Sequence, residues 1–196
     1  MYVPTVCSLP DTLEDRAIVV GHSSGGMIIT EVHRRLPKRI KALVYLAAFL
    51  LPPNKTPRDV LSMDAESLLP ACLEIDRSRA VSLVRRECAR NVFYGDCSER
   101  DAAWAISRLQ PEPLIPQGVA TDGVFGNSGN RPPRSYIECP QDKALGPSMQ
   151  RWMYTESSCA GVYSLPTSHS PFLSAPHALT QNDFDHAADR IIGAGP

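Results

Sequence analysis

Residues 21–25 read Gly-His-Ser-Ser-Gly, which is the G-x-S-x-G spacing that presents a serine hydroxyl for nucleophilic attack. A short β-branched run over 17–20 precedes them, and apolar residues at helical spacing follow over 27–36 until Pro37. The motif requires this context of strand, tight turn and helix, because the strained turn lifts the serine above the sheet edge. Small residues on both sides of the serine should avoid clashes across the turn. We predict Ser23 as a nucleophile, with an ordinary glycine loop as the alternative.

A serine hydroxyl needs a base to remove its proton, and a histidine oriented by a carboxylate supplies one. For this kind of elbow the chain order is serine, acid, histidine. His169 stands in a short polar loop after a strand-like run over 161–165, and the carboxyl end of a strand is where the base is needed. We predict His169 as the base. The other downstream histidines are expected on solvated helix faces: His33, His177 and His186.

The acid is expected at the end of the strand that precedes the histidine. Asp142 follows Cys139, which closes a strand-like run over 135–139. We predict that Asp142 orients the imidazole of His169. Three other carboxylates fit less well: Asp96, a turn or cap residue leading a helix; Asp122, in a Gly/Asn-rich loop; and Glu138, inside the strand and facing sideways.

Groups around these three residues have expected roles as well. The first N–H groups of a helix after the elbow point at the reacting carbonyl, so the Ser24 N–H is the expected oxyanion donor. Five ring side chains are candidates for an apolar substrate pocket: His22, Phe93, Tyr94, Trp104 and Trp152. Ordinary core packing is the alternative for the aromatic ones. No metal ligand set is found.

The elements that must position these residues indicate an α/β fold. Strand-like runs over 17–20, 42–46, 135–139 and 161–165 alternate with helices, including helices expected over 148–155 and 184–192. This alternation is typical of a mostly parallel sheet, here of about four strands flanked by helices. We assign residues 1–53 and 134–196 to this core.

The middle of the chain, residues 54–133, is expected to be a helical insertion between two strands of the sheet. It contains helical patterns over 79–91 and 99–109 and shows no convincing strand. An insertion there can act as a lid over a site at the carboxyl ends of the strands. A structural excursion without a gating role is the alternative.

Composition excludes several classes of function. The net charge is -1, with 20 basic and 21 acidic residues and no basic block, so nucleic-acid binding has no electrostatic support. No apolar run approaches the roughly 18 residues that span a bilayer. No basic region followed by an apolar one begins the chain, so no signal peptide is expected. The six cysteines form neither a C-x-x-C nor a zinc pattern and are expected as free thiols, which favours the cytoplasm.

Several stretches together resemble one family of α/β hydrolases, which includes plant methylesterases, plant hydroxynitrile lyases and bacterial pyrethroid-type carboxylesterases. The likeness lies at the elbow, the next strand, the insertion, the acid-bearing strand end, the helix after it and the histidine loop: 19–26, 43–49, 97–111, 136–142, 150–151 and 168–174. It implies a serine hydrolase that acts on a small-molecule carboxylic ester through an acyl-enzyme, without metal or organic cofactor. Ser170 stands where the lyases carry a lysine, which counts against cyanohydrin cleavage.

Family members have further strands and an HG-containing loop before the elbow, and this chain has only a short segment there. We therefore expect the C-terminal portion of the fold, present as a fragment, a shortened gene product or a natural half-domain. One oxyanion donor would be absent, and such a loss costs roughly 10²–10³ in rate. The strand over 17–20 would be an open edge, through which the chain could form a homodimer. The alternative function is a weakly active or inactive homologue that binds a ligand or a partner.

Overall fold

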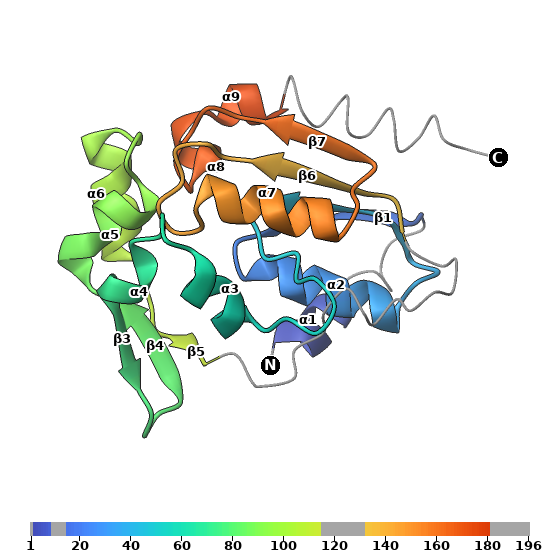
Figure 1. Ribbon diagram of the computed structural model, residues 1–196, viewed down its shortest axis with the longest axis horizontal. Coiled ribbons are helices and arrows are strands. Elements are labelled where there is room, and N and C mark those ends of the chain that lie inside the picture. Colours follow the sequence, from blue (N-terminus) through green and yellow to red (C-terminus); the bar gives the residue numbers. More distant parts are fainter. Residues whose placement is uncertain (1, 9–14, 115–131, 181–196) are drawn as a thin grey trace.

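A computed structural model describes residues 2–8, 15–114 and 132–180 of the chain. It has a parallel sheet with helices packed on it and a second, smaller group of elements to one side (Figure 1). The helix expected over 184–192, His186 and Asp122 lie outside the described residues. Within them, no helix is long and apolar enough to cross a membrane.

The main sheet has four strands in the order β1-β2-β6-β7, and every neighbouring pair is parallel. Their bounds are β1 Ala17–His22, β2 Ile40–Leu46, β6 Arg134–Glu138 and β7 Gly161–Ser164. The expected α/β class and all four expected strands are confirmed. Because the strands are parallel, their carboxyl ends meet at one edge, where the predicted site residues follow β1, β6 and β7.

Strand β2 shows why this sheet is central to the core. Its residues are almost all buried, and they alternate between two clusters, since successive side chains of a strand point to opposite faces. Leu43 and Tyr45 join the larger cluster, and Val44 and Leu46 join the smaller one. Residues from four helices complete the larger cluster: α1 Tyr2–Ser8, α2 Gly25–Arg35, α3 Pro57–Met63 and α7 Pro147–Glu156.

The buried position of His33 corrects a prediction made from the sequence. It was expected on the helix surface, yet it is only 4% exposed in α2. It follows Ile29 and Thr30 at helical spacing and therefore extends their buried stripe. Burial lowers the pKa of His33 below its ordinary value. His177, by contrast, is exposed as expected, at the short helix α9 Pro176–Ala178.

The insertion is not purely helical, and the expectation that it has no strand is wrong. It contains an antiparallel sheet ordered β3-β4-β5, with β3 Leu73–Asp76, β4 Val81–Val84 and β5 Glu112–Pro113. The helix expected from residue 79 begins only at Arg86, because residues 81–84 pair with 73–76. Asp76 fixes the hairpin turn by accepting hydrogen bonds from the backbone N–H groups of Ser78 and Arg79.

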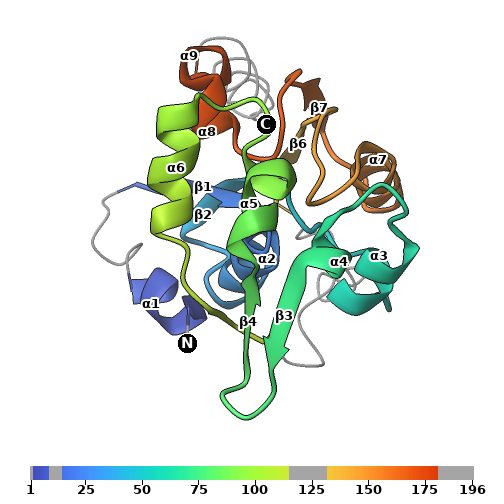
Figure 2. The ribbon, with the colours of Figure 1, turned by 90° about the vertical axis from the view of Figure 1, so that its left-hand side faces the viewer.

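Helices complete the insertion: α3 Pro57–Met63, α4 Leu69–Cys72, α5 Arg86–Phe93 and α6 Glu99–Ser107. In Figure 2, α5 and α6 stand in front of the main sheet, and α6 lies beside α8 Pro171–Ser174. Leu173 of α8 packs against the buried cluster of Tyr94, Cys97, Ala102 and Ala105. The insertion is therefore in direct contact with the segment that follows the predicted histidine loop.

Candidate active site

Ser23 lies in the tight turn between β1 and α2, with a φ of 53°. This left-handed backbone is strained for a residue with a side chain, as the elbow motif predicts. The turn is tied to the end of β2: the Ser23 carbonyl accepts from the Phe49 N–H at 3.0 Å, and the Ser23 N–H donates to the Leu46 carbonyl at 3.3 Å. Tertiary hydrogen bonds thus hold the strained backbone in place.

Space around the elbow glycines differs from the sequence expectation at one position. A Cβ on Gly21 would lie 2.7 Å from the Gly25 carbonyl oxygen, so a small residue is required there. A Cβ on Gly25 would meet nothing within 4 Å, so the expected clash at that position is wrong. The tight position is Gly26, whose Cβ would lie 2.4 Å from the Phe49 carbonyl oxygen. The helix therefore packs through Gly26 against the segment that follows β2.

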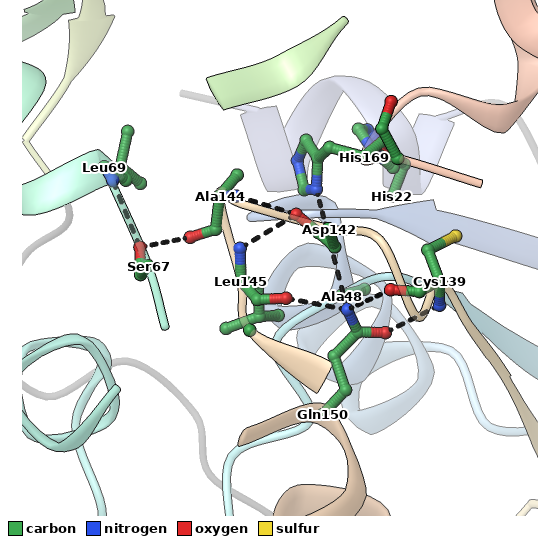
Figure 3. Close-up of polar contacts among 12 residues, drawn as sticks. His22, Ala48, Ser67, Leu69, Cys139, Asp142, Ala144, Leu145, Gln150 and His169 are labelled. Carbon is green, nitrogen blue, oxygen red and sulfur yellow. Dashed lines mark hydrogen bonds and ion pairs between the residues drawn. The ribbon is translucent and has the colours of Figure 1, made fainter. Parts of the chain in front are cut away.

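Asp142 and His169 are brought together at the carboxyl ends of β6 and β7. His169 Nδ1 lies 2.7 Å from Asp142 Oδ2, and the two residues are 2% and 0% exposed (Figure 3). The other carboxylate oxygen of Asp142 accepts from the backbone N–H groups of Ala144 and Leu145, at 2.7 and 3.0 Å. A carboxylate with these partners is an acceptor, so it fixes the proton on Nδ1 and leaves the lone pair on Nε2 of His169.

Gln150 of α7 is a site residue that the sequence reasoning missed. It is fully buried and its Nε2 donates to Asp142 Oδ2 at 3.1 Å (Figure 3). Its amide also bonds the backbone of Leu145 and Cys139, with Nε2 to the Leu145 carbonyl at 2.7 Å and Oε1 to the Cys139 N–H at 3.1 Å. Gln150 therefore fixes both the acid and the loop that carries it. A polar residue on the buried face of an amphipathic helix was the available signal.

His22 was expected to line a substrate pocket, and it lies against the predicted base. Its Nε2 is 2.8 Å from the His169 carbonyl oxygen, and the two ring centroids are 4.5 Å apart. Burial, helped by the charge that His169 can carry, lowers the pKa of His22 to about 3. The neutral ring can then donate its Nε2–H to that carbonyl. His22 packs edge-on to Phe172 on its other side.

The other predicted pocket residues separate into two groups. Phe93 is the one that reaches the site, with its ring centroid 5.5 Å from that of His169. Tyr94 is buried in the cluster between α5, α6 and α8, and Trp152 packs against the main core. Trp104 is 52% exposed, with Arg108 stacked over its ring. For Tyr94 and Trp152 the packing alternative describes their contacts.

Two polar contacts join the insertion to the site, and both were missed from the sequence. The Ser24 hydroxyl donates to Glu112 Oε1 of β5 at 2.8 Å. The Asp96 carboxylate accepts from both the backbone N–H and the hydroxyl of Ser168, the residue before His169. Asp96 is therefore not a helix cap, and the N-cap of α6 is Ser98.

The described residues contain no cluster of three or more His, Cys, Asp or Glu side chains that could hold a metal ion. What the arrangement can do is transfer a proton. A histidine held by a buried carboxylate lies at the same sheet edge as an elbow serine, which is the basis of nucleophilic acyl transfer. Ser24 stands at the start of α2, where the first backbone N–H groups have no partner within the helix.

Comparison with known proteins gives the class. The profile described as "Alpha/beta hydrolase family" matches residues 3–181. The chain therefore belongs to the α/β-hydrolase family, and the resemblance found in the sequence is confirmed.

Its relatives are named as ester hydrolases. The chain is 30% identical over 194 residues to a pyrethroid hydrolase of Sphingobium wenxiniae, covering 95% of this chain and 69% of that protein. It is 26% identical over 182 residues to putative methylesterase 14 of Arabidopsis thaliana, covering 88% of this chain but only 51% of that protein. A solved pyrethroid hydrolase from Sphingobium faniae superposes with a TM-score of 0.70 at 27% identity, covering 95% and 76% of the two chains. The chain is thus a homologue of carboxylic ester hydrolases.

Proposed function

We propose that this chain is a serine hydrolase that cleaves carboxylic esters of small molecules through an acyl-enzyme. The observation that carries the proposal is the buried hydrogen bond of 2.7 Å between His169 Nδ1 and Asp142 Oδ2, at the edge where the elbow serine is presented. The names of the relatives, pyrethroid hydrolase and methylesterase, support an ester as the substrate class.

The proposed reaction has two halves. His169 Nε2 takes the Ser23 hydroxyl proton while Ser23 Oγ bonds the acyl carbon, and Asp142 stabilises the imidazolium that forms. Collapse of the tetrahedral intermediate breaks the ester C–O bond, and His169 returns the proton to the departing alcohol. A water then repeats the sequence on the acyl-enzyme, releasing the carboxylic acid and free Ser23. The Ser24 N–H donates to the oxyanion in both halves.

We further propose that residues 54–133 act as a lid that shapes the pocket, with Phe93 on its inner wall. The contacts of Glu112 with Ser24 and of Asp96 with Ser168 support a lid seated on the site. The proposed compartment is the cytoplasm, supported by six free cysteines, although three of the relatives, putative methylesterases 14, 12 and 11, are named chloroplastic.

A homodimer through β1 is also part of the proposal. Among the described residues β1 pairs only with β2, and its Ile18 and Val20 are 37% and 42% exposed. Light scattering on the purified chain should then give twice its monomer mass, and Val20→Lys should give the monomer. If the wild-type chain is a monomer, the dimer proposal is wrong and the hydrolase proposal is unaffected.

Labelling with a fluorophosphonate probe tests the hydrolase proposal directly. Mass spectrometry should find one adduct, on Ser23, and neither Ser23→Ala nor His169→Ala should form it. Folded protein that forms no adduct and turns over no ester would reject the hydrolase and favour the ligand-binding or interaction protein. Cyanide release from a cyanohydrin would instead indicate a lyase, which Ser170 disfavours.

A further inference from the structure

The turn between α5 and α6 holds the loop of the predicted base from outside the main sheet. Asp96 Oδ2 accepts from the Ser168 N–H at 2.9 Å, and Asp96 Oδ1 accepts from the Ser168 hydroxyl in a short hydrogen bond. Ser168 is only 5% exposed, and its next neighbour in the chain is His169. We call this pair of hydrogen bonds the Asp96–Ser168 clamp. One carboxylate thus fixes both the backbone and the side chain of the residue before the base.

The clamp completes a set of three restraints on His169. Asp142 holds the ring at Nδ1, and His22 holds the backbone carbonyl on the far side of the residue. The clamp fixes the peptide on the near side. The three partners come from three separate segments, and Asp96 alone comes from the insertion. Because the insertion supplies one restraint, the base is fully held only when the α5–α6 turn is seated.

The charge state of Asp96 suits this role. Partial burial acts to raise the pKa of Asp96, but the hydrogen bonds from Ser168 and Ser174 outweigh burial and the pKa lies below its usual range. The group is therefore a carboxylate near neutral pH, and both of its oxygens can accept. Hydrogen bonds to an ionised acceptor are stronger than neutral ones. Leu173 also packs against the buried cluster that includes Tyr94 and Cys97, and this contact holds the α5–α6 turn beside the histidine loop.

We propose that Asp96 is a positioning residue for the reaction, acting through Ser168 on the placement of the His169 imidazole. The inference rests on the proposed hydrolase function. Asp96 does not touch the reacting atoms, so its loss should alter where Nε2 points and leave the nucleophile and the acid in place. The alternative is a tether that only stabilises the insertion. A tether of this kind predicts that kcat is unchanged in Asp96→Ala.

Three variants separate the two roles. Asp96→Ala removes the clamp, and Asp96→Asn keeps one oxygen that can accept from the Ser168 N–H. Asp101→Ala is the matched control: Asp101 also bonds a serine hydroxyl in the insertion, but that serine is Ser98, the N-cap of α6. Its loss weakens the helix without reaching the histidine loop.

A positioning role predicts a loss in kcat with little change in KM. For Asp96→Ala we expect kcat to fall about 10- to 100-fold, since small misplacement of a catalytic group has effects of this size. Asp96→Asn should recover part of the loss, and Asp101→Ala should retain wild-type kcat. Equal kcat in wild type and Asp96→Ala, an effect on KM alone, or an equal loss in Asp101→Ala would overturn the proposal.

A second measurement needs no turnover. In ¹⁵N-histidine-labelled protein the hydrogen-bonded Nδ1–H of His169 should give a slowly exchanging signal, identified by its absence in His169→Ala. We expect the signal to broaden or vanish in Asp96→Ala and to persist in Asp101→Ala. An unchanged signal in Asp96→Ala would overturn the proposal that Asp96 positions His169. If the wild type hydrolyses no ester, the proposed function fails, and this signal still decides whether Asp96 positions His169.

Discussion

Gln150 Nε2 and His169 Nδ1 share one oxygen, Oδ2 of Asp142, at 3.1 and 2.7 Å. The amide therefore holds the same carboxylate oxygen that holds the imidazole. It does so from inside the core, since Gln150 is fully buried in α7. The orientation of the predicted base thus depends on a side chain of a helix that contributes no reacting group.

Replacing Gln150 with alanine should disturb both stability and activity. The change leaves the Cys139 N–H and the Leu145 carbonyl without their partner, and buried polar groups left unpaired cost about 1–3 kcal/mol each. We expect the free energy of unfolding to fall by about 2–6 kcal/mol and kcat to fall about tenfold, because the acid is less well held. Urea denaturation and ester kinetics measure the two effects. Gln141→Ala, which removes an exposed amide bonded to Pro166, should change neither; equal losses in both variants would reject the role of Gln150.

Adjacent glycines at the start of α2 should respond oppositely to alanine. Gly26→Ala would place a methyl group 2.4 Å from the Phe49 carbonyl oxygen, and such overpacking costs about 1–3 kcal/mol. Gly25→Ala meets no atom within 4 Å and should keep stability within about 1 kcal/mol, or raise it, since alanine favours helix. Chemical denaturation of the pair measures the difference. A Gly25→Ala variant as unstable as Gly26→Ala would contradict the packing described for the elbow.

The pKa of His22 predicts acid sensitivity. Its pKa is about 3 in the folded chain, against 6.5 as the ordinary value, so between these pH values the unfolded chain binds a proton that the folded chain does not. The free energy of unfolding should therefore be highest above pH 6.5 and fall as the pH drops toward 3. His22→Gln should flatten this slope. The pKa of buried His33 is also lowered, and His33→Gln measures how much His33 contributes to the same pH dependence of the free energy of unfolding. An unchanged slope in His22→Gln would contradict a neutral, buried His22.

Glu112 should influence which esters are accepted. Its carboxylate bonds the Ser24 hydroxyl next to the predicted nucleophile, so it places a negative charge near the oxyanion donor. Under the proposed function, Glu112→Gln should raise kcat/KM for esters with an anionic acyl group by several-fold relative to neutral esters, because like charges repel. Glu74→Gln makes the same charge change on an exposed residue of β3 and should leave the ratio unaltered. A ratio that shifts equally in both variants would assign the effect to net charge alone.

The main sheet was predictable because its signal is local. Runs such as 42–46 are apolar throughout, and a strand buried on both faces needs that pattern. The hairpin of the insertion was missed because Leu73–Asp76 alternates apolar and acidic residues in only four positions and pairs mainly with Val81–Val84. The helical spacing after residue 79 then hid the strand. The helix begins only at Arg86 because residues 81–84 pair with 73–76 across the turn that Asp76 fixes.

The pairing of His169 with Asp142 was reached from chain order and strand ends. Their supporting contacts were not. Asp96 meets Ser168 across 72 positions, and Glu112 meets Ser24 across 88. Such pairs leave no local periodicity, because the elements involved are brought together only by the packed insertion. His33 shows the related limit: its burial follows from which face of α2 is covered, and a polar residue at that position reads equally well as surface.

The left-handed backbone at Ser23 has a consequence for engineering this chain. A glycine would adopt a φ of 53° without steric strain, so removing the side chain at residue 23 relaxes the turn while abolishing the chemistry proposed for it. Selection for heat resistance alone would then favour variants that have lost activity. A useful screen for this protein must measure turnover and melting temperature together, because a change at the elbow that raises stability can abolish activity.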